Sequence, residues 1–291
     1  MEIQPVSVKS VFEIFQDELQ DIYDEREIKE FIYLLFYEWK EWNKMQVRLN
    51  YHEMLSYEES SRFFNALISL KFHVPVQQVT GKTFFCGYPL VITPDVLIPR
   101  QETEELVEMV VKENQKRKTE KMAILDIGTG SGCIAISLKK NFPLSSVTAL
   151  DNSEKALSVA RDNSKRNDCH IEFFHSDILS GKEWIQFPFF DLIVSNPPYV
   201  LESEKELMRK NVTEYEPWDA LFVPDHDPFR FYDAIAGFAI LHLNIYGKIY
   251  LEINERFGSE VRSILVNKGF DKAEVIKDIH GKERFIRAGL T

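Results

Sequence analysis

The strongest local signal for the fold is the stretch Ile124-Leu125-Asp126-Ile127-Gly128-Thr129-Gly130-Ser131-Gly132. The apolar start of this stretch predicts a buried strand, and the residues from about 131 to 141 predict a helix. Glycines between a strand and a helix permit positive φ values and let a ligand touch the backbone. The turn therefore indicates a binding site at the end of a strand, although dinucleotide-binding proteins use a similar turn.

Strands and helices alternate on both sides of this turn. The apolar patterns predict strands at 122–127, 146–150, 171–175, 190–195 and 248–253, helices at 102–117, 131–141, 153–166, 229–243 and 257–268, and two short terminal strands. Alternation of this kind predicts an α/β fold whose mostly parallel sheet is covered on both faces. Ligands of such sheets bind at the carboxyl ends of the strands.

The residues before this region have a different pattern. Apolar residues recur at helical spacing over about the first 75 residues, which predicts a small helical bundle. Strand formers surround Gly87 between Thr83 and Ile92, which predicts a β-hairpin. We therefore expect three parts: a helical bundle at 1–78, a β-hairpin linker at 79–100 and the α/β domain at 101–291.

Composition narrows the class of protein. The 291 residues contain 35 Lys and Arg against 46 Asp and Glu, a formal charge of −11, and 44% are hydrophobic. This balance is typical of a globular chain and argues against direct nucleic-acid binding, which needs a basic face. No apolar run is long enough to cross a bilayer. The three cysteines and seven histidines show no ligand spacing, so we expect no bound metal. We also expect the chain to be cytoplasmic and monomeric.

Two details of the glycine turn favour a particular ligand. The dinucleotide pattern requires a third glycine where Cys133 stands. Asp126 ends the strand, and its carboxylate would repel a pyrophosphate but attract an ammonium group. S-adenosylmethionine is a cation with an amino-acid tail, and it fits these requirements.

Acidic residues also follow the next two strands. Asp151 can accept both hydroxyls of an adenosine ribose, although it could also be a helix N-cap. Asp177 could accept the adenine amino group, and Ile178 could pack against the ring. Acids at three successive strand ends together favour a nucleoside site.

The strand at 190–195 runs directly into Asn196-Pro197-Pro198-Tyr199. The two prolines stiffen the loop and remove backbone donors. The Asn196 side-chain oxygen and the Pro197 carbonyl remain as acceptors, and Tyr199 supplies an aromatic face. This set suits a planar NH₂ group held in line with a sulfonium methyl, so that catalysis needs positioning and electrostatics without a strong base. We interpret Asn196, Pro197 and Tyr199 as catalytic, and all four residues as binding the substrate.

With these two motifs, the chain resembles the HemK/PrmC-type release factor glutamine methyltransferases, which have the class I methyltransferase fold. The resemblance covers roughly residues 70–290, and its supporting segments are 75–81, 85–87, 97–104, 215–217, 220–221 and 281–284. It implies transfer of a methyl group from S-adenosylmethionine to the side-chain amide nitrogen of Gln in the Gly-Gly-Gln loop of class I peptide release factors, leaving S-adenosylhomocysteine. It also implies that the bundle and hairpin grip the release factor. The cofactor contacts we expect are Asp126, Gly128, Thr129, Gly130, Ser131, Gly132, Asp151, Asp177, Ile178 and Asn196.

Several alternatives stay open. An adenine methyltransferase uses the same four-residue loop but needs a basic approach surface for a flipped base. A glutamine methyltransferase acting on a ribosomal protein is closer, although segment 100–104 resembles the release-factor branch better. A protein that only binds the nucleoside cofactor could have a broken acceptor loop, whereas the loop at 196–199 is intact here. A dehydrogenase is disfavoured by Asp126 and by the spacing of the glycines. Gln78, Gln101 and Ile178 depart from the family pattern.

Overall fold

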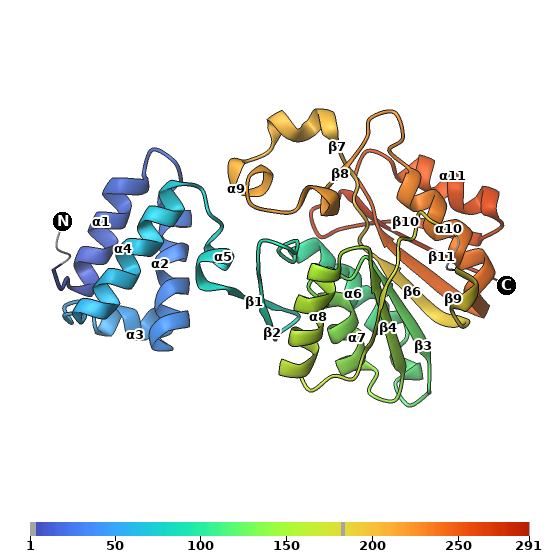
Figure 1. The fold of residues 1–291 in the computed structure, drawn as a ribbon, viewed down its shortest axis with the longest axis horizontal. Helices are drawn as coiled ribbons and strands as arrows, with labels where there is room; N and C mark the ends of the chain where they lie inside the picture. Colours follow the sequence, from blue (N-terminus) through green and yellow to red (C-terminus); the bar gives the residue numbers. More distant parts are fainter. Residues whose placement is uncertain (1–3, 182–183, 291) are drawn as a thin grey trace. The chain divides into compact units, whose positions relative to one another are not determined.

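The computed structural model describes residues 4–181 and 184–290 (Figure 1). The chain divides into two compact units, each of which makes most of its residue contacts within itself. The first unit comprises 1–81 and 210–215, and the second comprises 82–209 and 216–291. In the described ranges, no helix combines the length and the apolar character that a membrane span requires.

The first unit is helical. It contains α1 (Val8–Leu19), α2 (Glu25–Lys40), α3 (Lys44–Leu49), α4 (Tyr57–Lys71), α5 (Val76–Thr80) and α9 (Lys210–Thr213). Ser7, Asp24 and Ser56 accept backbone N–H groups at the starts of three helices, which satisfies donors that a helix leaves unpaired. The rings of Phe36 and Phe63 meet in the apolar core, with centroids 4.5 Å apart. The predicted helical bundle is thus confirmed.

A short segment from the second half of the chain belongs to the same unit. The Tyr215 hydroxyl donates to the Phe72 carbonyl at 2.5 Å, and Gln78 Nε2 donates to the Tyr215 carbonyl at 2.8 Å. Gln78, one of the departures from the family pattern, therefore fixes the segment that carries α9.

The hairpin forms as predicted, from β1 (Lys82–Phe85) and β2 (Tyr88–Val91). Its anchor in the second unit is the buried Asn163 side chain. Asn163 Oδ1 accepts from Val91 N at 2.7 Å, and Asn163 Nδ2 donates to the carbonyls of Val91 and Ser131 at 3.0 and 2.9 Å. One side chain thus ties the hairpin to the glycine turn.

A seven-stranded sheet organises the second unit. Its strands are β3 (Ala123–Ile127), β4 (Ser146–Asp151), β5 (Glu172–His175), β6 (Phe190–Ser195), β9 (Leu243–Glu252), β10 (Asp271–Lys277) and β11 (Glu283–Gly289). The order is β10-β11-β9-β6-β3-β4-β5, and only the pairs that involve β11 are antiparallel. This confirms the predicted α/β fold with a mostly parallel sheet.

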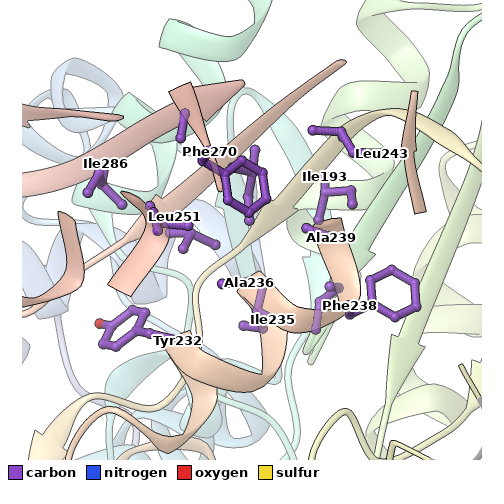
Figure 2. Packing of buried hydrophobic residues seen from close by; sticks show 14 of the residues in the cluster. Ile193, Tyr232, Ile235, Ala236, Phe238, Ala239, Leu243, Leu251, Phe270 and Ile286 are labelled. Carbon is purple, nitrogen blue, oxygen red and sulfur yellow. The ribbon is translucent and has the colours of Figure 1, made fainter. Parts of the chain in front are cut away.

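Helices cover both faces of this sheet (Figure 1). α6 (Gln101–Glu113), α7 (Cys133–Asn141) and α8 (Glu154–Arg166) contact β9, β4 and β5 respectively, whereas α10 (Arg230–His242) and α11 (Gly258–Lys268) contact β9, β10 and β11. Side chains alternate along β3: Leu125 and Ile127 join the core under α10, and Ile124 joins the core under α7. Figure 2 shows Ala239 of α10 beside Ile193 of the sheet, and Phe238 belongs to the same apolar cluster.

Some boundaries differ from the predicted ones. β9 begins at Leu243 rather than at 248, because Leu243 pairs with Phe190 ahead of an irregularity where Tyr246 has a φ of 66°. The terminal strands β10 and β11 have seven residues each and are not short. Six elements of two to six residues were not predicted, because they are too short to show a period. They are η1 (Gln115–Arg117), η2 (Trp184–Gln186), β7 (Val200–Leu201), η3 (Glu202–Leu207), η4 (Trp218–Ala220) and β8 (Phe222–Val223).

Candidate active site

A cavity of about 330 Å³ lies at the carboxyl ends of the parallel strands. Register explains its position: Ile127 pairs with Leu150 and Ser195, and Ser195 pairs with Leu251, so these strands end at one level. Its walls are formed by Asp95, Val96, Leu97, Ile127, Gly128, Gly130, Leu150, Asp151, Asn152, Ser153, Ala156, Ser176, Asp177, Ile178, Ser195, Asn196, Pro197, Pro198, Pro217, Asp219, Ala220, Phe231 and Ile235. A cavity of this size and place is typical of a small-ligand site.

The glycine turn opens onto the cavity through its backbone. Gly128 and Gly130 have φ values of 72° and 54°, and a Cβ on either would meet no atom within 4 Å. This space lets a ligand lie directly against the turn.

Asp126 lies behind the turn and not among the lining residues. Its Oδ2 accepts from the Thr129 hydroxyl at 2.7 Å and from Ala135 N at 3.1 Å, while Oδ1 has no partner in the described chain. Burial raises the pKa of Asp126 to about 7. Asp126 therefore links the glycine turn to the start of α7, and its Oδ1 remains able to accept a hydrogen bond.

Gly132 is the glycine that packs tightly. It has a φ of 84°, and a Cβ there would lie 3.2 Å from Ala160 Cβ and 3.3 Å from Ala160 Cα. We expect Gly132→Ala to destabilise the second unit by about 1–3 kcal/mol, measured as a lower thermal midpoint. Gly281→Ala is the matched control, because Gly281 has a φ of 81° with open space around it. An equal loss in both variants would contradict the packing argument.

Asp151 is held in place by backbone donors. Its Oδ2 accepts from Gly130 N and its Oδ1 from Ser153 N, both at 2.9 Å. Burial raises the pKa of Asp151, and these backbone hydrogen bonds counteract the effect of burial. Each carboxylate oxygen can accept a second hydrogen bond, which leaves capacity for two ligand hydroxyls.

Four carboxylates line the cavity: Asp95, Asp151, Asp177 and Asp219. None of the lining residues in the described chain is Lys, Arg or His. Asp177 is exposed and its Oδ1 accepts from Leu179 N, whereas Ile178 is buried. A wall of this charge favours a cationic ligand over one that carries phosphates.

The loop after β6 brings the Asn196 side chain to the cavity wall. Asn196 Nδ2 donates to Thr103 Oγ1 at 2.9 Å, and Thr103 Oγ1 donates to Glu252 Oε2 at 2.7 Å. The Tyr199 hydroxyl donates to Glu252 Oε1 at 2.9 Å, and Tyr199 is not among the lining residues. The Asn196 nitrogen is thereby occupied inside the protein.

An ion pair between the buried Glu216 and the partly exposed Arg100 joins two walls of the cavity. Glu216, whose side chain is 1% exposed, accepts from Ile98 N at 2.9 Å and pairs with Arg100 at 2.5 Å. Leu97 precedes one partner and Pro217 follows the other, and both line the cavity.

We expect Glu216→Ala to lower the thermal midpoint by roughly 4–8 °C, because it leaves Arg100 and the Ile98 N–H without their buried acceptor. Glu154→Ala is the control, since it removes the exposed pair with Arg161 and should cost under about 1 kcal/mol. Similar midpoints for the two variants would show that the buried pair contributes little.

The structure brings most of the predicted site residues to the cavity. Gly128, Gly130, Asp151, Asp177, Ile178, Asn196, Pro197 and Pro198 line it, whereas Asp126, Thr129, Ser131, Gly132 and Tyr199 lie behind the lining. Thr103 and Glu252 were not predicted as site residues, although both contact the Asn196 loop. Glu252 offered a signal, because it is an acid at the end of a buried strand, as Asp126 and Asp151 are.

Two solved structures share the fold of this chain. A methyltransferase from Pyrococcus furiosus matches with a TM-score of 0.50 and 19% identity, covering 80% of this chain and 99% of that one. The hMettl16 catalytic domain matches with a TM-score of 0.53 and 13% identity, covering 80% and 82%. The family described as Methyltransferase small domain matches residues 102–214. The fold is that of the class I methyltransferases.

Two curated relatives match nearly the whole chain. The release factor glutamine methyltransferase of Flavobacterium psychrophilum is 42% identical over 95% of this chain and 96% of its own. That of Bacteroides thetaiotaomicron is 42% identical over 93% and 95%. The chain belongs to the release factor glutamine methyltransferase family, which confirms the resemblance stated from its motifs.

Proposed function

We propose that this chain transfers a methyl group from S-adenosylmethionine to the side-chain amide nitrogen of Gln in the Gly-Gly-Gln loop of class I peptide release factors. The observation that carries the proposal is the Asn196 loop at the rim of an acidic cavity, in a chain 42% identical to enzymes of that name. The products are the N-methylated glutamine and S-adenosylhomocysteine.

The cavity fits S-adenosylmethionine part by part. The open backbone at Gly128 and Gly130 would receive the amino-acid tail, with the unpartnered Asp126 Oδ1 behind it. Asp151 would accept the ribose hydroxyls, Asp177 the adenine amino group, and Ile178 would pack on the ring. In the described ranges, no group of three or more His, Cys, Asp or Glu is arranged to hold a metal ion.

The acceptor loop supplies positioning. S-adenosylmethionine provides an electrophilic methyl group on a positively charged sulfur. Asn196 Oδ1 and the Pro197 carbonyl would each accept one N–H of the glutamine amide, which aims the nitrogen lone pair at that methyl. The N–C bond forms as the S–C bond breaks, and the nitrogen then releases a proton to solvent. Fixed acceptors of this kind stabilise the positive charge that develops on the nitrogen.

We also propose that the helical bundle recognises the protein substrate, whereas the α/β domain carries out the chemistry. The bundle and hairpin offer no motif of their own, so this role rests on the family resemblance. We propose that the chain acts as a monomer. We also propose that it binds no nucleic acid directly, which fits its net charge of −11.

Mass spectrometry tests the function directly. The full chain is incubated with a class I release factor and S-adenosylmethionine carrying a deuterated methyl group, and the digested release factor is analysed. We expect one labelled methyl on the Gln of its Gly-Gly-Gln loop. Parallel incubations replace the release factor by ribosomal proteins or by RNA and DNA. Label on a ribosomal-protein Gln or on adenine in these incubations, with none on the release factor, would overturn the proposal in favour of an alternative substrate.

A further inference from the structure

Four polar side chains form a chain of hydrogen bonds that runs from the cavity wall at Asn196 to the buried Thr103 and Glu252. Asn196, from the loop after β6, contacts Thr103 of α6, and Thr103 contacts Glu252 at the end of β9. Tyr199 donates to the other oxygen of Glu252. We call Asn196, Thr103, Glu252 and Tyr199 the orienting chain.

The direction of these hydrogen bonds fixes the orientation of the Asn196 amide. A hydroxyl group has a single proton to donate. Thr103 gives that proton to Glu252 Oε2, so towards Asn196 it can only accept. The Asn196 NH₂ group must then face Thr103, and its oxygen faces away from Thr103.

Ionised Glu252 accepts from Thr103 on one oxygen and from Tyr199 on the other, so the assays of this inference are run at pH 8 or above. Burial raises the pKa of Glu252 to about 7, while hydrogen bonds from Thr103 and Tyr199 and the charge of Arg284 oppose that rise. Burial and the negative charge of Glu252 raise the pKa of Tyr199 well above its ordinary value. The Tyr199 hydroxyl therefore keeps its proton and donates it.

We propose that Glu252, acting through Thr103, is a positioning residue that turns the Asn196 oxygen toward the substrate and so makes the site select a primary carboxamide over a carboxylate. An oxygen presented to the substrate accepts an N–H and repels a carboxylate oxygen. A site built to bond one polar group rejects an analogue that lacks it far more strongly than an apolar pocket does. This inference rests on the proposed function, because it names how that site recognises glutamine.

Glu252→Gln reverses the direction of the chain. The introduced amide can donate to Thr103, whose hydroxyl is then free to donate to Asn196 Oδ1, and the Asn196 NH₂ group turns toward the substrate. We expect kcat/KM for the release factor to fall roughly 10–100-fold with most of the loss in kcat. The affinity for S-adenosylmethionine should change little, because Glu252 does not line the cavity.

Thr103 offers a second variant that keeps the shape of the site. Thr103→Val removes the hydroxyl but not the volume, so Asn196 loses the acceptor that fixes it. Thr103→Ser keeps the hydroxyl and should recover most of the rate that Thr103→Val loses. A role in packing alone would predict the opposite ranking, because valine fills the space better than serine.

The decisive readout is selectivity between amide and carboxylate. A release factor whose acceptor Gln is replaced by Glu is used as an inhibitor of the wild-type enzyme and of Glu252→Gln. For each enzyme, the inhibition constant of the Glu-containing release factor is divided by the KM of the unchanged release factor. We expect this ratio to be at least about tenfold lower for Glu252→Gln than for the wild-type enzyme. Equal relative inhibition, with kcat/KM retained within twofold, would overturn the inference.

An NMR measurement separates this inference from the proposed function. In the wild-type chain with selectively labelled asparagine, the Asn196 amide protons should show a nuclear Overhauser effect to the Thr103 methyl group. The effect should disappear in Glu252→Gln, which keeps Thr103. If no release factor is methylated by the wild-type chain, the proposed function fails, and this measurement still decides the orientation. An unchanged effect in Glu252→Gln would contradict the role of Glu252.

Discussion

Asn196→Ala is expected to lower the rate of methyl transfer by roughly 10²–10³-fold, the loss typical when one fixed polar group is removed from an active site. The variant lacks the oxygen that would accept an N–H of the glutamine amide and aim its lone pair. Thr103 and Glu252 remain in place, so the cavity keeps its shape. Single-turnover assays with labelled S-adenosylmethionine measure the rate, and calorimetry measures the affinity for the cofactor, which should stay within a few-fold.

Asn267→Ala is the matched control for this variant. Asn267 is exposed on α11 and does not line the cavity, so its replacement should leave both quantities unchanged. Near-normal turnover in Asn196→Ala would mean that the acceptor amide is held elsewhere. A large loss of cofactor affinity would mean that Asn196 serves the cofactor more than the acceptor.

Asp151→Ala is expected to weaken S-adenosylmethionine binding by roughly 10–100-fold, because hydrogen bonds to a charged group contribute about 1.5–3 kcal/mol. The variant loses the proposed acceptor for the ribose hydroxyls. It also frees Gly130 N and Ser153 N, which Asp151 holds at 2.9 Å, and so loosens the glycine turn. Isothermal titration of S-adenosylmethionine measures this effect.

Asp162→Ala on the exposed face of α8 has the same charge change and no place in the cavity, and it should bind the cofactor normally. If Asp151→Ala also bound normally, the ribose would be held by other groups. A nicotinamide dinucleotide in the same titration should bind less tightly than S-adenosylmethionine, because four carboxylates line the cavity. Tighter binding of the dinucleotide would defeat the choice of cofactor.

The central part of the sheet could be predicted from sequence because β3, β4 and β6 are largely buried on both faces. The run Leu192-Ile193-Val194 in β6 is apolar and buried, and the glycine turn marks where β3 ends. Because ligands bind at the carboxyl ends of parallel strands, the sequence predicts that Asp151 and Asn196 lie near one another.

The orienting chain could not be predicted in the same way. Its members come from α6, the loop after β6 and the end of β9, which are far apart in sequence and meet only through the register of the sheet. The direction of the Asp126 side chain could not be predicted either. Side chains alternate between the two faces of a strand, and the Asp126 carboxylate faces α7, where it accepts from Ala135 N. The role of the Tyr199 ring in the acceptor site stays a prediction.

The segment at 196–229 shows a further limit. It lacks periodicity, yet Glu216 within it pairs with Arg100 and helps to form the cavity wall. Residues 210–215 belong with the helical unit, and nothing in their composition indicates this. Contacts of this kind depend on tertiary packing and leave no local pattern.

A structure of the chain with S-adenosylmethionine analogue and a release factor bound would test the account most directly. The account predicts that Asn196 Oδ1 lies at hydrogen-bond distance, about 2.7–3.2 Å, from the acceptor glutamine nitrogen. That nitrogen should lie about 3–3.5 Å from the methyl position. A glutamine amide bound away from residues 196–199, or an Asn196 whose NH₂ group faces it, would contradict the account.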